Sequence, residues 1–180
     1  HVYQRVPELI EDASNELPGR FRILIDRLLQ HLKALDVQVR ELEREIERWH
    51  RSSEVSRRLE TIPGIGPMTA SALVASAGDP ANFKNARQFA AWIGLVPHQN
   101  SSGGKTQLLG ISKRGNVYLR TLLIHGGRTL VQLAKTRADQ AGSWLGKLVS
   151  RRHHNIAAVA MANKNARLAW ALLSSGKAYE

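Results

Sequence analysis

Residues 21–49 read FRILIDRLLQHLKALDVQVRELEREIERW, and this stretch decides the architecture of the first third of the chain. Apolar residues recur in it at alternating spacings of four and three: Phe21, Ile25, Leu28, Leu32, Leu35, Val39, Leu42, Ile46 and Trp49. This heptad pattern predicts one long helix with a narrow apolar seam. Because so narrow a stripe needs a partner, we expect a coiled coil with a second chain. The alternative is an antiparallel hairpin with the short acidic segment 5–17.

Charge divides the chain into two unlike parts. Residues 1–60 contain 11 Lys and Arg against 12 Asp and Glu, a net charge of −1. Residues 61–180 contain 15 Lys and Arg and only Asp79, Asp139 and Glu180 as acids, a net charge of +12. A surface this basic favours a polyanionic partner, so we interpret the second part as nucleic-acid binding. The alternative is a solubilising surface, although such surfaces usually mix both signs.

The composition excludes several classes of protein. With 180 residues and a hydrophobic share of 43%, the chain is expected to fold rather than remain disordered. The absence of cysteine excludes disulfides and thiolate metal sites and fits a reducing compartment. No signal peptide and no apolar run near about 18 residues is found, so we predict a soluble protein without a membrane partner. Together with the basic second part, this leads us to expect a cytoplasmic, nucleoid-associated location. Since the sequence begins at His1, we expect a fragment or a processed chain.

The remaining patterns predict a mainly α fold. Residues 1–52 form an N-terminal segment and the long helix, and residues 53–180 form a compact basic domain of helices. Within that domain, Leu95–Val96 and Leu108–Leu109 can pair as a short β-hairpin. A helix over 116–135 is expected to bend at Gly126–Gly127.

Residues 62–66, IPGIG, are the first candidate binding element. Gly64 and Gly66 allow positive φ and a close backbone approach, and Pro67 suits the first position of a following helix. The free N–H groups of that helix could face a phosphate. The stretch resembles a helix-hairpin-helix motif, which holds nucleic-acid backbone without reading sequence. The alternative is a plain turn between two packed helices.

Residues 98–107, HQNSSGGKTQ, form a glycine-rich loop with three competing interpretations: a flexible turn, a phosphate-binding loop or the carrier of a nucleophile. A Walker A loop is excluded because Gln99 stands where its first glycine belongs, and no Asp lies between 80 and 138 to hold magnesium. Three widely spaced acids in the basic part also provide no metal-carboxylate site.

A side-chain nucleophile fits this loop. Ser101 and Ser102 adjoin Gly103 and Gly104, which let a substrate backbone approach closely. Nearby cations can stabilise the charge that develops on an attacked phosphate, and they are Lys105, Lys113, Arg114 and Arg120. His98 or His125 could accept the serine proton.

Two clusters are assigned ordinary roles. Trp92, Trp144 and Trp170 lie on apolar helix faces and are interpreted as core rather than as base-stacking platforms. His153–His154 beside Arg151–Arg152 are interpreted as a basic patch rather than a metal site, because adjacent histidines on one helix are expected to point apart.

Three stretches together resemble a known family: LETIPGIGPMTASAL, FKNARQFAAWIGLVPHQNSSGGKTQLLGISKRGNVYLRTLL and MANKNARLAWALL. Their order is similar to the C-terminal half of the DEDD-type insertion-sequence transposases, relatives of the pilin-gene invertases that include recombinases guided by a bridge RNA. The resemblance covers residues 59–175 and is most specific from Trp92 to Leu123.

The resemblance implies specific roles. The family's serine-glycine pair falls on Ser102–Gly103, so Ser102 is the expected nucleophile for a DNA end, with Ser101 as the fallback. The family's G-I-S-K-x-G-N-x-x-L-R segment matches from Gly110 to Arg120, which implies that Lys113 and Arg120 contact phosphate. Asn116 is expected to organise polar groups or to cap a helix.

The resemblance also implies what lies outside these residues. A RuvC-like domain with four acidic residues precedes the rod in that family, so magnesium is expected there and no cofactor in this chain. The expected partners are DNA, a guide RNA and a second copy of the chain, with dimer and tetramer both open. The predicted function is DNA cutting and rejoining through a phosphoserine link. The alternative is a non-catalytic nucleic-acid-binding and dimerisation module.

Overall fold

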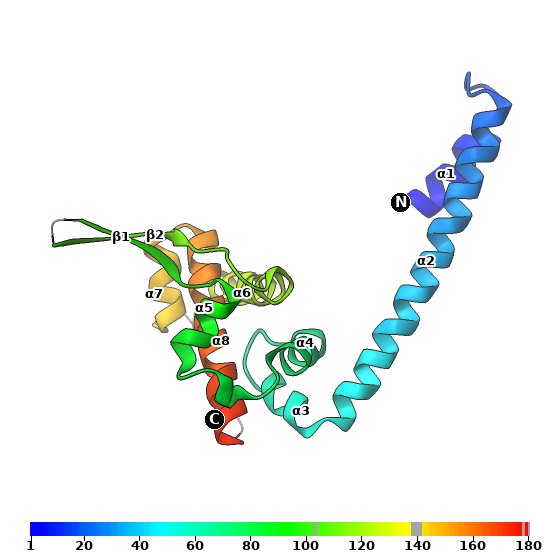
Figure 1. Ribbon diagram of the computed structural model, residues 1–180. Coiled ribbons are helices and arrows are strands. Elements are labelled where there is room, and N and C mark those ends of the chain that lie inside the picture. Colours follow the sequence, from blue (N-terminus) through cyan, green and yellow to red (C-terminus); the bar gives the residue numbers. More distant parts are fainter. Residues whose placement is uncertain (103, 138–141, 178, 180) are drawn as a thin grey trace. The chain divides into compact units, whose positions relative to one another are not determined.

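A computed structural model describes residues 1–102, 104–137, 142–177 and 179, apart from the side chains of Ser102 and Thr106. These ranges are mostly helical and include one small antiparallel sheet of two strands. The prediction of a mainly α fold with a short β-hairpin is therefore confirmed (Figure 1). The chain falls into two compact units, residues 1–46 and 47–180. No helix within these ranges combines the length and the hydropathy that crossing a bilayer requires.

The first unit contains α1 (Val2–Glu11) and most of α2 (Gly19–Ser52), which is the predicted long helix. The two run antiparallel, since Tyr3 Oη donates to Asp36 while Arg22 donates to the carbonyls of Asp12 and Asn15 at 2.9 and 3.1 Å. The only large apolar side chain of this unit that becomes buried is Leu29, which is 4% exposed. The alternative of a hairpin with the preceding segment is therefore realised on one face of α2.

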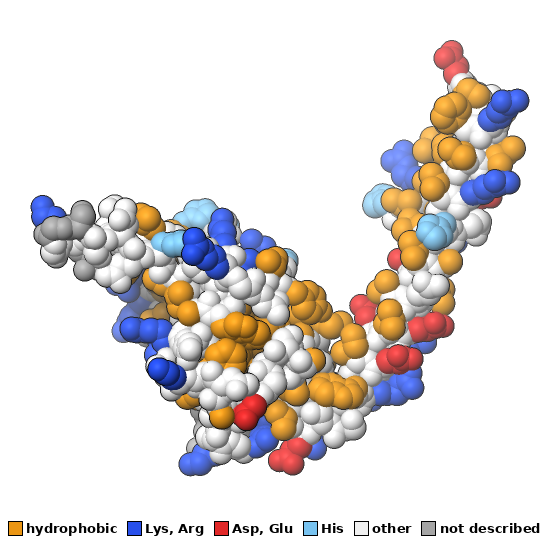
Figure 2. Space-filling model, viewed as in Figure 1, with side chains coloured by type: hydrophobic (Ala, Val, Ile, Leu, Met, Phe, Trp, Pro, Cys, Tyr) orange, Lys and Arg blue, Asp and Glu red, His pale blue; other side chains and the backbone are white. Residues whose placement is uncertain are grey.

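The apolar seam of α2 lies largely uncovered within this unit. Most of its members are more than a third exposed: Phe21, Leu28, Leu32, Leu35, Val39 and Leu42. Figure 2 shows hydrophobic side chains running along α2. Helix α1 therefore leaves the seam available, and pairing with a second chain stays a prediction.

The second unit begins in the last turns of α2, and its described residues contain nine further elements. They are α3 (Glu54–Glu60), α4 (Pro67–Ala77), the 3-10 turn η1 (Pro80–Asn82), α5 (Ala86–Ile93), β1 (Pro97–Ser102), β2 (Lys105–Ile111), α6 (Val117–Thr136), α7 (Trp144–Arg151) and α8 (His154–Ser175). Helix α4 starts where the sequence predicts, with Pro67 in its first turn, and the side chain of Asn85 caps the start of α5.

Helices α6 and α8 form the centre of this unit, and the other helices pack around them. The core combines large side chains from α5 and α6 with small ones from α8, since Phe89, Leu119 and Leu123 are fully buried against Ala162 and Ala166. Each large side chain removed from water contributes roughly 1.5–3 kcal/mol. Because the alanine side chains of α8 are small, this helix can pack closely against the large side chains of α5 and α6.

Two adjacent glycines set the position of α6. A Cβ at Gly126 would lie 1.9 Å from the carbonyl oxygen of Gly64, and one at Gly127 would lie 2.4 Å from the carbonyl oxygen of Ala158. Both positions therefore admit only glycine. The predicted bend is not needed to explain the pair, because α6 is one helix from Val117 to Thr136 and its glycines serve close packing.

The β-hairpin is fixed to α5 through main-chain hydrogen bonds. The amides of Ser112 and Lys113 donate to the carbonyls of Val96 and Gly94 at 2.8 and 3.1 Å. Gly115 adopts φ 102°, and a Cβ there would lie 1.9 Å from the carbonyl oxygen of Trp92. The segment after β2 consequently follows the end of α5 at backbone contact distance.

We expect Gly115→Ala to lower the free energy of unfolding by about 2 kcal/mol or more, because it combines a positive φ with a main-chain clash. Gly110→Ala is the matched control, since nothing lies within 4 Å of its Cβ position. This variant should unfold within about 0.5 kcal/mol of the parent. Urea unfolding followed by circular dichroism measures both, and equal losses in the two variants would contradict the packing described for Gly115.

Candidate functional site

The tip of the β-hairpin brings the predicted nucleophile beside a predicted cation. Strands β1 and β2 are antiparallel, and Ser102 pairs with Lys105 in the register. Gly104 adopts φ 78° in the turn, a conformation that glycine tolerates. Gly103 and the Ser102 side chain lie outside the described part of the structure. Figure 1 shows the hairpin projecting from the helices of its unit.

His98 is not adjacent to Ser102, and His125 as the acceptor of the serine proton stays a prediction. Four residues of strand separate His98 from Ser102, a distance of roughly 13 Å. The Nε2 of His98 also lies 3.2 Å from the carbonyl oxygen of Ser112 at the base of the hairpin. His125 is exposed on α6. Ser101 is exposed, and its hydroxyl oxygen accepts a hydrogen bond of 2.9 Å from the Gln99 side chain.

Three of the four predicted cations are exposed: Lys105 at the tip, and Lys113 and Arg114 in the segment after β2. Lys113 holds a left-handed backbone conformation, φ 55°, which is uncommon for a side chain of its kind. On the face seen in Figure 2, Lys and Arg side chains lie along the edge of this unit from the hairpin tip downward. The arrangement can place positive charge at several points of a polyanion.

Arg120 departs from its prediction as a phosphate contact. Its side chain is buried, with 8% exposed, and Nη1 donates a hydrogen bond of 2.9 Å to the carbonyl of Ile93. It therefore satisfies the carboxyl end of α5 inside the fold, and we remove it from the candidate contacts. The prediction that Asn116 caps a helix is confirmed, because its side-chain oxygen accepts a hydrogen bond of 3.0 Å from the amide of Leu119.

The two glycines of IPGIG lie in different surroundings. Gly64, at φ 83°, faces α6, where a Cβ would meet Leu130 Cδ1 at 2.8 Å. Asn165 of α8 holds this turn by donating to the carbonyl of Pro63 at 2.8 Å. Gly66 precedes α4, and nothing lies within 4 Å of its Cβ position. Of the two, only Gly66 has open space for an approaching phosphate, and phosphate binding by this turn stays a prediction.

Trp144 departs from the prediction that it belongs to the core. It is 47% exposed at the start of α7, and the Nζ of Lys164 lies 4.9 Å from the centre of its ring. Trp92 contacts the rings of Phe83 and Phe89, and Trp170 donates to the carbonyl of Pro80 at 3.2 Å, so these two serve packing as predicted. Trp144 instead lines a groove of about 860 Å³ between the hairpin base and α8.

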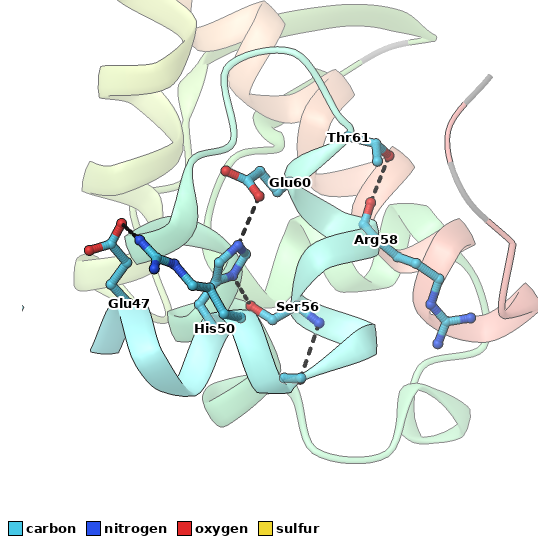
Figure 3. A network of polar contacts seen from close by, with 8 residues as sticks. Glu47, His50, Ser56, Arg58, Glu60 and Thr61 are labelled. Carbon is cyan, nitrogen blue, oxygen red and sulfur yellow. Dashed lines mark hydrogen bonds and ion pairs between the residues drawn. The ribbon is translucent and has the colours of Figure 1, made fainter. Parts of the chain in front are cut away.

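A Ser–His–Glu chain at the junction of α2 and α3 is not predicted by any pattern in the sequence (Figure 3). His50 Nδ1 lies 2.7 Å from Ser56 Oγ, and His50 Nε2 lies 2.8 Å from Glu60 Oε2. The constellation has the composition of a hydrolase triad, but Ser56 is 0% exposed and cannot meet a substrate. It fixes the last turn of α2 to α3. His50 lies six residues before Ser56 and ten before Glu60, and the helix break between them removes the regular period that would reveal these contacts.

His153 and His154 differ from the expectation that adjacent histidines point apart. Their ring centres are 4.0 Å apart, because His153 is the N-cap of α8 and His154 its first residue. Loss of hydration, together with His153, Lys135 and Arg128, lowers the pKa of His154. Among the described residues, no three His, Asp or Glu side chains gather to hold a metal ion.

Comparison with known proteins accounts for this arrangement of turn, hairpin and following segment. Residues 56–142 match the transposase family described as IS116/IS110/IS902. This segment is similar to members of that family. It contains the IPGIG turn, the hairpin and the segment from Gly110 to Arg120.

The chain as a whole is similar to insertion-sequence proteins of bacteria. It is 48% identical to a probable family 20 transposase of Pseudomonas aeruginosa over 91% of this chain and 48% of that protein. It is 43% identical to the transposase for insertion sequence element IS1111A of Coxiella burnetii over 98% of this chain and 49% of that protein. It is 42% identical to the transposase for insertion sequence element IS1328 of Yersinia enterocolitica over 99% of this chain and 53% of that protein. The chain thus spans about half the length of these curated relatives.

We expect Arg120→Gln to lower the free energy of unfolding by about 1–3 kcal/mol, because it leaves the buried carbonyl of Ile93 without its donor. The control is Lys113→Gln, which removes an exposed charge from the same segment and should change stability by less than about 0.5 kcal/mol. Urea unfolding of both variants measures the difference. An Arg120→Gln protein as stable as the parent would return Arg120 to the candidate phosphate contacts.

Proposed function

We propose that this chain is the DNA-binding and serine-bearing part of an insertion-sequence transposase. The observation that carries the proposal is the family match over residues 56–142, because that segment holds the Ser–Ser–Gly–Gly–Lys sequence, in which Ser101 and Lys105 are exposed. The net charge of +12 over residues 61–180 supports a DNA partner. The open space beside Gly66 supports backbone binding by the helix-hairpin-helix-like turn.

In the proposed reaction the Ser102 hydroxyl oxygen attacks a DNA phosphorus atom. A P–O bond to the serine forms as the P–O bond to one sugar oxygen breaks, the serine proton goes to a general base, and the leaving sugar oxygen takes up a proton. The reverse attack by a second sugar hydroxyl rejoins DNA and frees the serine. One phosphodiester-type bond replaces another at each step, so no ATP is consumed.

The residues of this chain would hold the phosphate for that attack. Lys105 lies opposite Ser102 in the hairpin register and can balance charge on the phosphate oxygens. Nothing lies within 4 Å of the Cβ position of Gly104, which leaves space there for the DNA backbone. Lys113 and Arg114 supply positive charge at the hairpin base.

The remaining parts of the proposal concern groups that these 180 residues do not contain. A RuvC-like domain with carboxylate-held magnesium would activate the phosphate as a Lewis acid. A guide RNA would select the DNA sites. The acid-poor composition of residues 61–180 supports a division in which this part supplies the serine and the cations.

We expect the full-length protein, given guide RNA, DNA substrate and magnesium, to form a covalent protein–DNA adduct that a denaturing gel detects. Ser102→Ala should abolish the adduct because it removes the attacking oxygen, and Ser101→Ala should retain it. Both variants should bind DNA as the parent does. Parental strand exchange in the same tube is the control that the system is active. Loss only in Ser101→Ala would transfer the nucleophile to the neighbouring serine.

An adduct that survives both substitutions would contradict the role of the hairpin as carrier of the nucleophile. Full strand exchange by Ser102→Ala would favour the alternative function, a nucleic-acid-binding and dimerisation module without catalysis.

We further propose that the α2 seam pairs with a second copy of the chain as a coiled coil. The supporting observation is the exposure of the heptad positions, which reaches 58% at Phe21, 62% at Leu28 and 58% at Leu42. Association would bury these side chains against their counterparts, at roughly 25 cal/mol for each Å² removed from water.

Val39 and Val37 offer a matched test of the coiled coil. Both are about half exposed, at 51% and 50%, but only Val39 belongs to the seam. We expect Val39→Lys to weaken self-association at least about tenfold, since it places a charge in the seam, while Val37→Lys leaves it unchanged. Sedimentation equilibrium of the 180-residue chain measures the constant. A monomeric parent, or equal effects of the two variants, would contradict the proposed seam.

A further inference from the structure

The groove beside the hairpin base is a second candidate binding site, in addition to the serine at the hairpin tip. Its volume is about 860 Å³, and its walls come from β2 and α8 with Trp144 of α7 at one side. The floor is apolar and includes Leu95, Ile111 and Val159. An apolar floor of this extent beside an exposed indole favours a flat, largely apolar ligand group.

The charges of the groove are all of one sign. Lys113, Lys164 and Arg167 line it, and its lining contains no Asp or Glu. All three cationic residues are exposed. A ligand that complements this groove therefore combines flat rings for the floor with negative charge for the rim, which is the chemistry of a nucleotide.

The base in the groove has to be unpaired. A base inside a duplex is stacked and paired, so its face cannot lie against Trp144 unless it leaves the stack. Stacking on an aromatic side chain tolerates any base, because every base has a π-face. The groove would therefore take a single strand with little regard to its sequence.

The apolar walls favour DNA over RNA as the source of that strand. A 2′-hydroxyl buried against Leu95, Ile111 and Val159 would lose hydration without a hydrogen-bond partner from these side chains. Deoxyribose has no such group. Of the two asparagines that line the groove, Asn163 donates through Nδ2 to the carbonyl of Leu95 at 2.9 Å, and Asn155 lies exposed at the start of α8.

The groove is continuous with the hairpin that carries Ser102. Leu109, Gly110 and Ile111 of β2 line the groove, and β2 begins at Lys105 beside the tip. Four strand residues separate Leu109 from Lys105, roughly 13 Å. A strand seated in the groove can thus extend along the hairpin toward the serine.

We propose that this groove binds an unpaired segment of the DNA strand next to the phosphate attacked at the tip, with a base stacked on Trp144 and phosphates on Lys113, Lys164 and Arg167. The inference rests on the proposed function of the hairpin and assigns that site a second, single-strand-specific subsite.

The first test measures binding of the 180-residue chain to a fluorescent oligothymidylate of about ten nucleotides, by anisotropy at fixed salt. Trp144→Ala should weaken this binding about tenfold, and Trp144→Phe should retain most of it. A duplex of the same length should bind both variants within about twofold of the parent, because phosphate contacts dominate duplex binding. The matched control is Tyr118→Ala, since Tyr118 is 55% exposed but does not line the groove.

The second test uses the charges. The double variant Lys164→Gln with Arg167→Gln should reduce the salt dependence of oligothymidylate binding by about 0.7 in log–log slope for each phosphate that the variant no longer neutralises. Lys147→Gln on α7, which lies outside the groove lining, should leave the slope unchanged.

Several outcomes would overturn the proposal. Equal losses on single strand and duplex in Trp144→Ala, or no loss on either, would remove the stacking role. Oligouridylate bound as tightly as oligothymidylate would remove the commitment to DNA. Thermal unfolding of each variant shows whether it folds, and Trp144→Phe preserves the test if the alanine variant is unstable.

These outcomes are separable from failure of the serine chemistry. If the single-strand preference depends on Trp144 and no Ser102 adduct forms, the subsite stands and the nucleophile lies elsewhere. If the adduct forms and Trp144→Ala leaves all binding unchanged, the serine stands and the subsite fails.

Discussion

Backbone-to-backbone contact along α6 is the constraint on which the rest of the second unit depends. Neighbouring residues of a helix point about 100° apart, so Gly126 and Gly127 meet different partners. One faces the carbonyl of Gly64 in the IPGIG turn and the other faces the carbonyl of Ala158 in α8. A glycine within a helix costs about 0.5–1 kcal/mol relative to alanine. That cost is offset by bringing three parts of the chain into contact at main-chain distance.

Helix α8 then links the two candidate binding elements. Asn163 donates to the carbonyl of Leu95, just before the hairpin, and Asn165 donates to the carbonyl of Pro63 in the IPGIG turn. Both hydrogen bonds give a main-chain carbonyl oxygen a partner, and burial of that oxygen without a partner would destabilise the fold. The turn and the hairpin base are therefore held by the same helix two residues apart, and neither can shift without disturbing the other's support.

Local patterns predicted much of this architecture, because they depend on short-range physics. The heptads indicated α2, and Asn85 and Asn116 mark helix starts through their own side chains. The glycine pair between short apolar runs indicated the hairpin, but its strands are Pro97–Ser102 and Lys105–Ile111, so the predicted pairing of Leu95–Val96 with Leu108–Leu109 is wrong. In each case the deciding interaction lies within a few residues of the chain.

The residues whose exposure was predicted wrongly are those whose burial depends on how distant elements are rotated against one another. Lys113 and Arg120 are both basic, yet Lys113 is exposed in the segment before α6, while the rotation of α6 against α5 buries Arg120. Trp144 belongs to a helix of eight residues, and only packing against its neighbours decides whether its indole is covered. The His50 chain joins two helices across a break, so no single period encodes it.

The attachment of the hairpin through amides and carbonyls separates two kinds of sequence change. Its base is held by the main-chain bonds of Ser112 and Lys113, while Ser101, Gly104 and Lys105 lie exposed at the far end. Replacement of a tip side chain therefore changes the chemistry presented to a ligand with little effect on folding. The same separation means that a tip variant which loses function reports on the chemistry of the tip and not on folding, and it makes the tip a tolerant place to introduce a new reactive group.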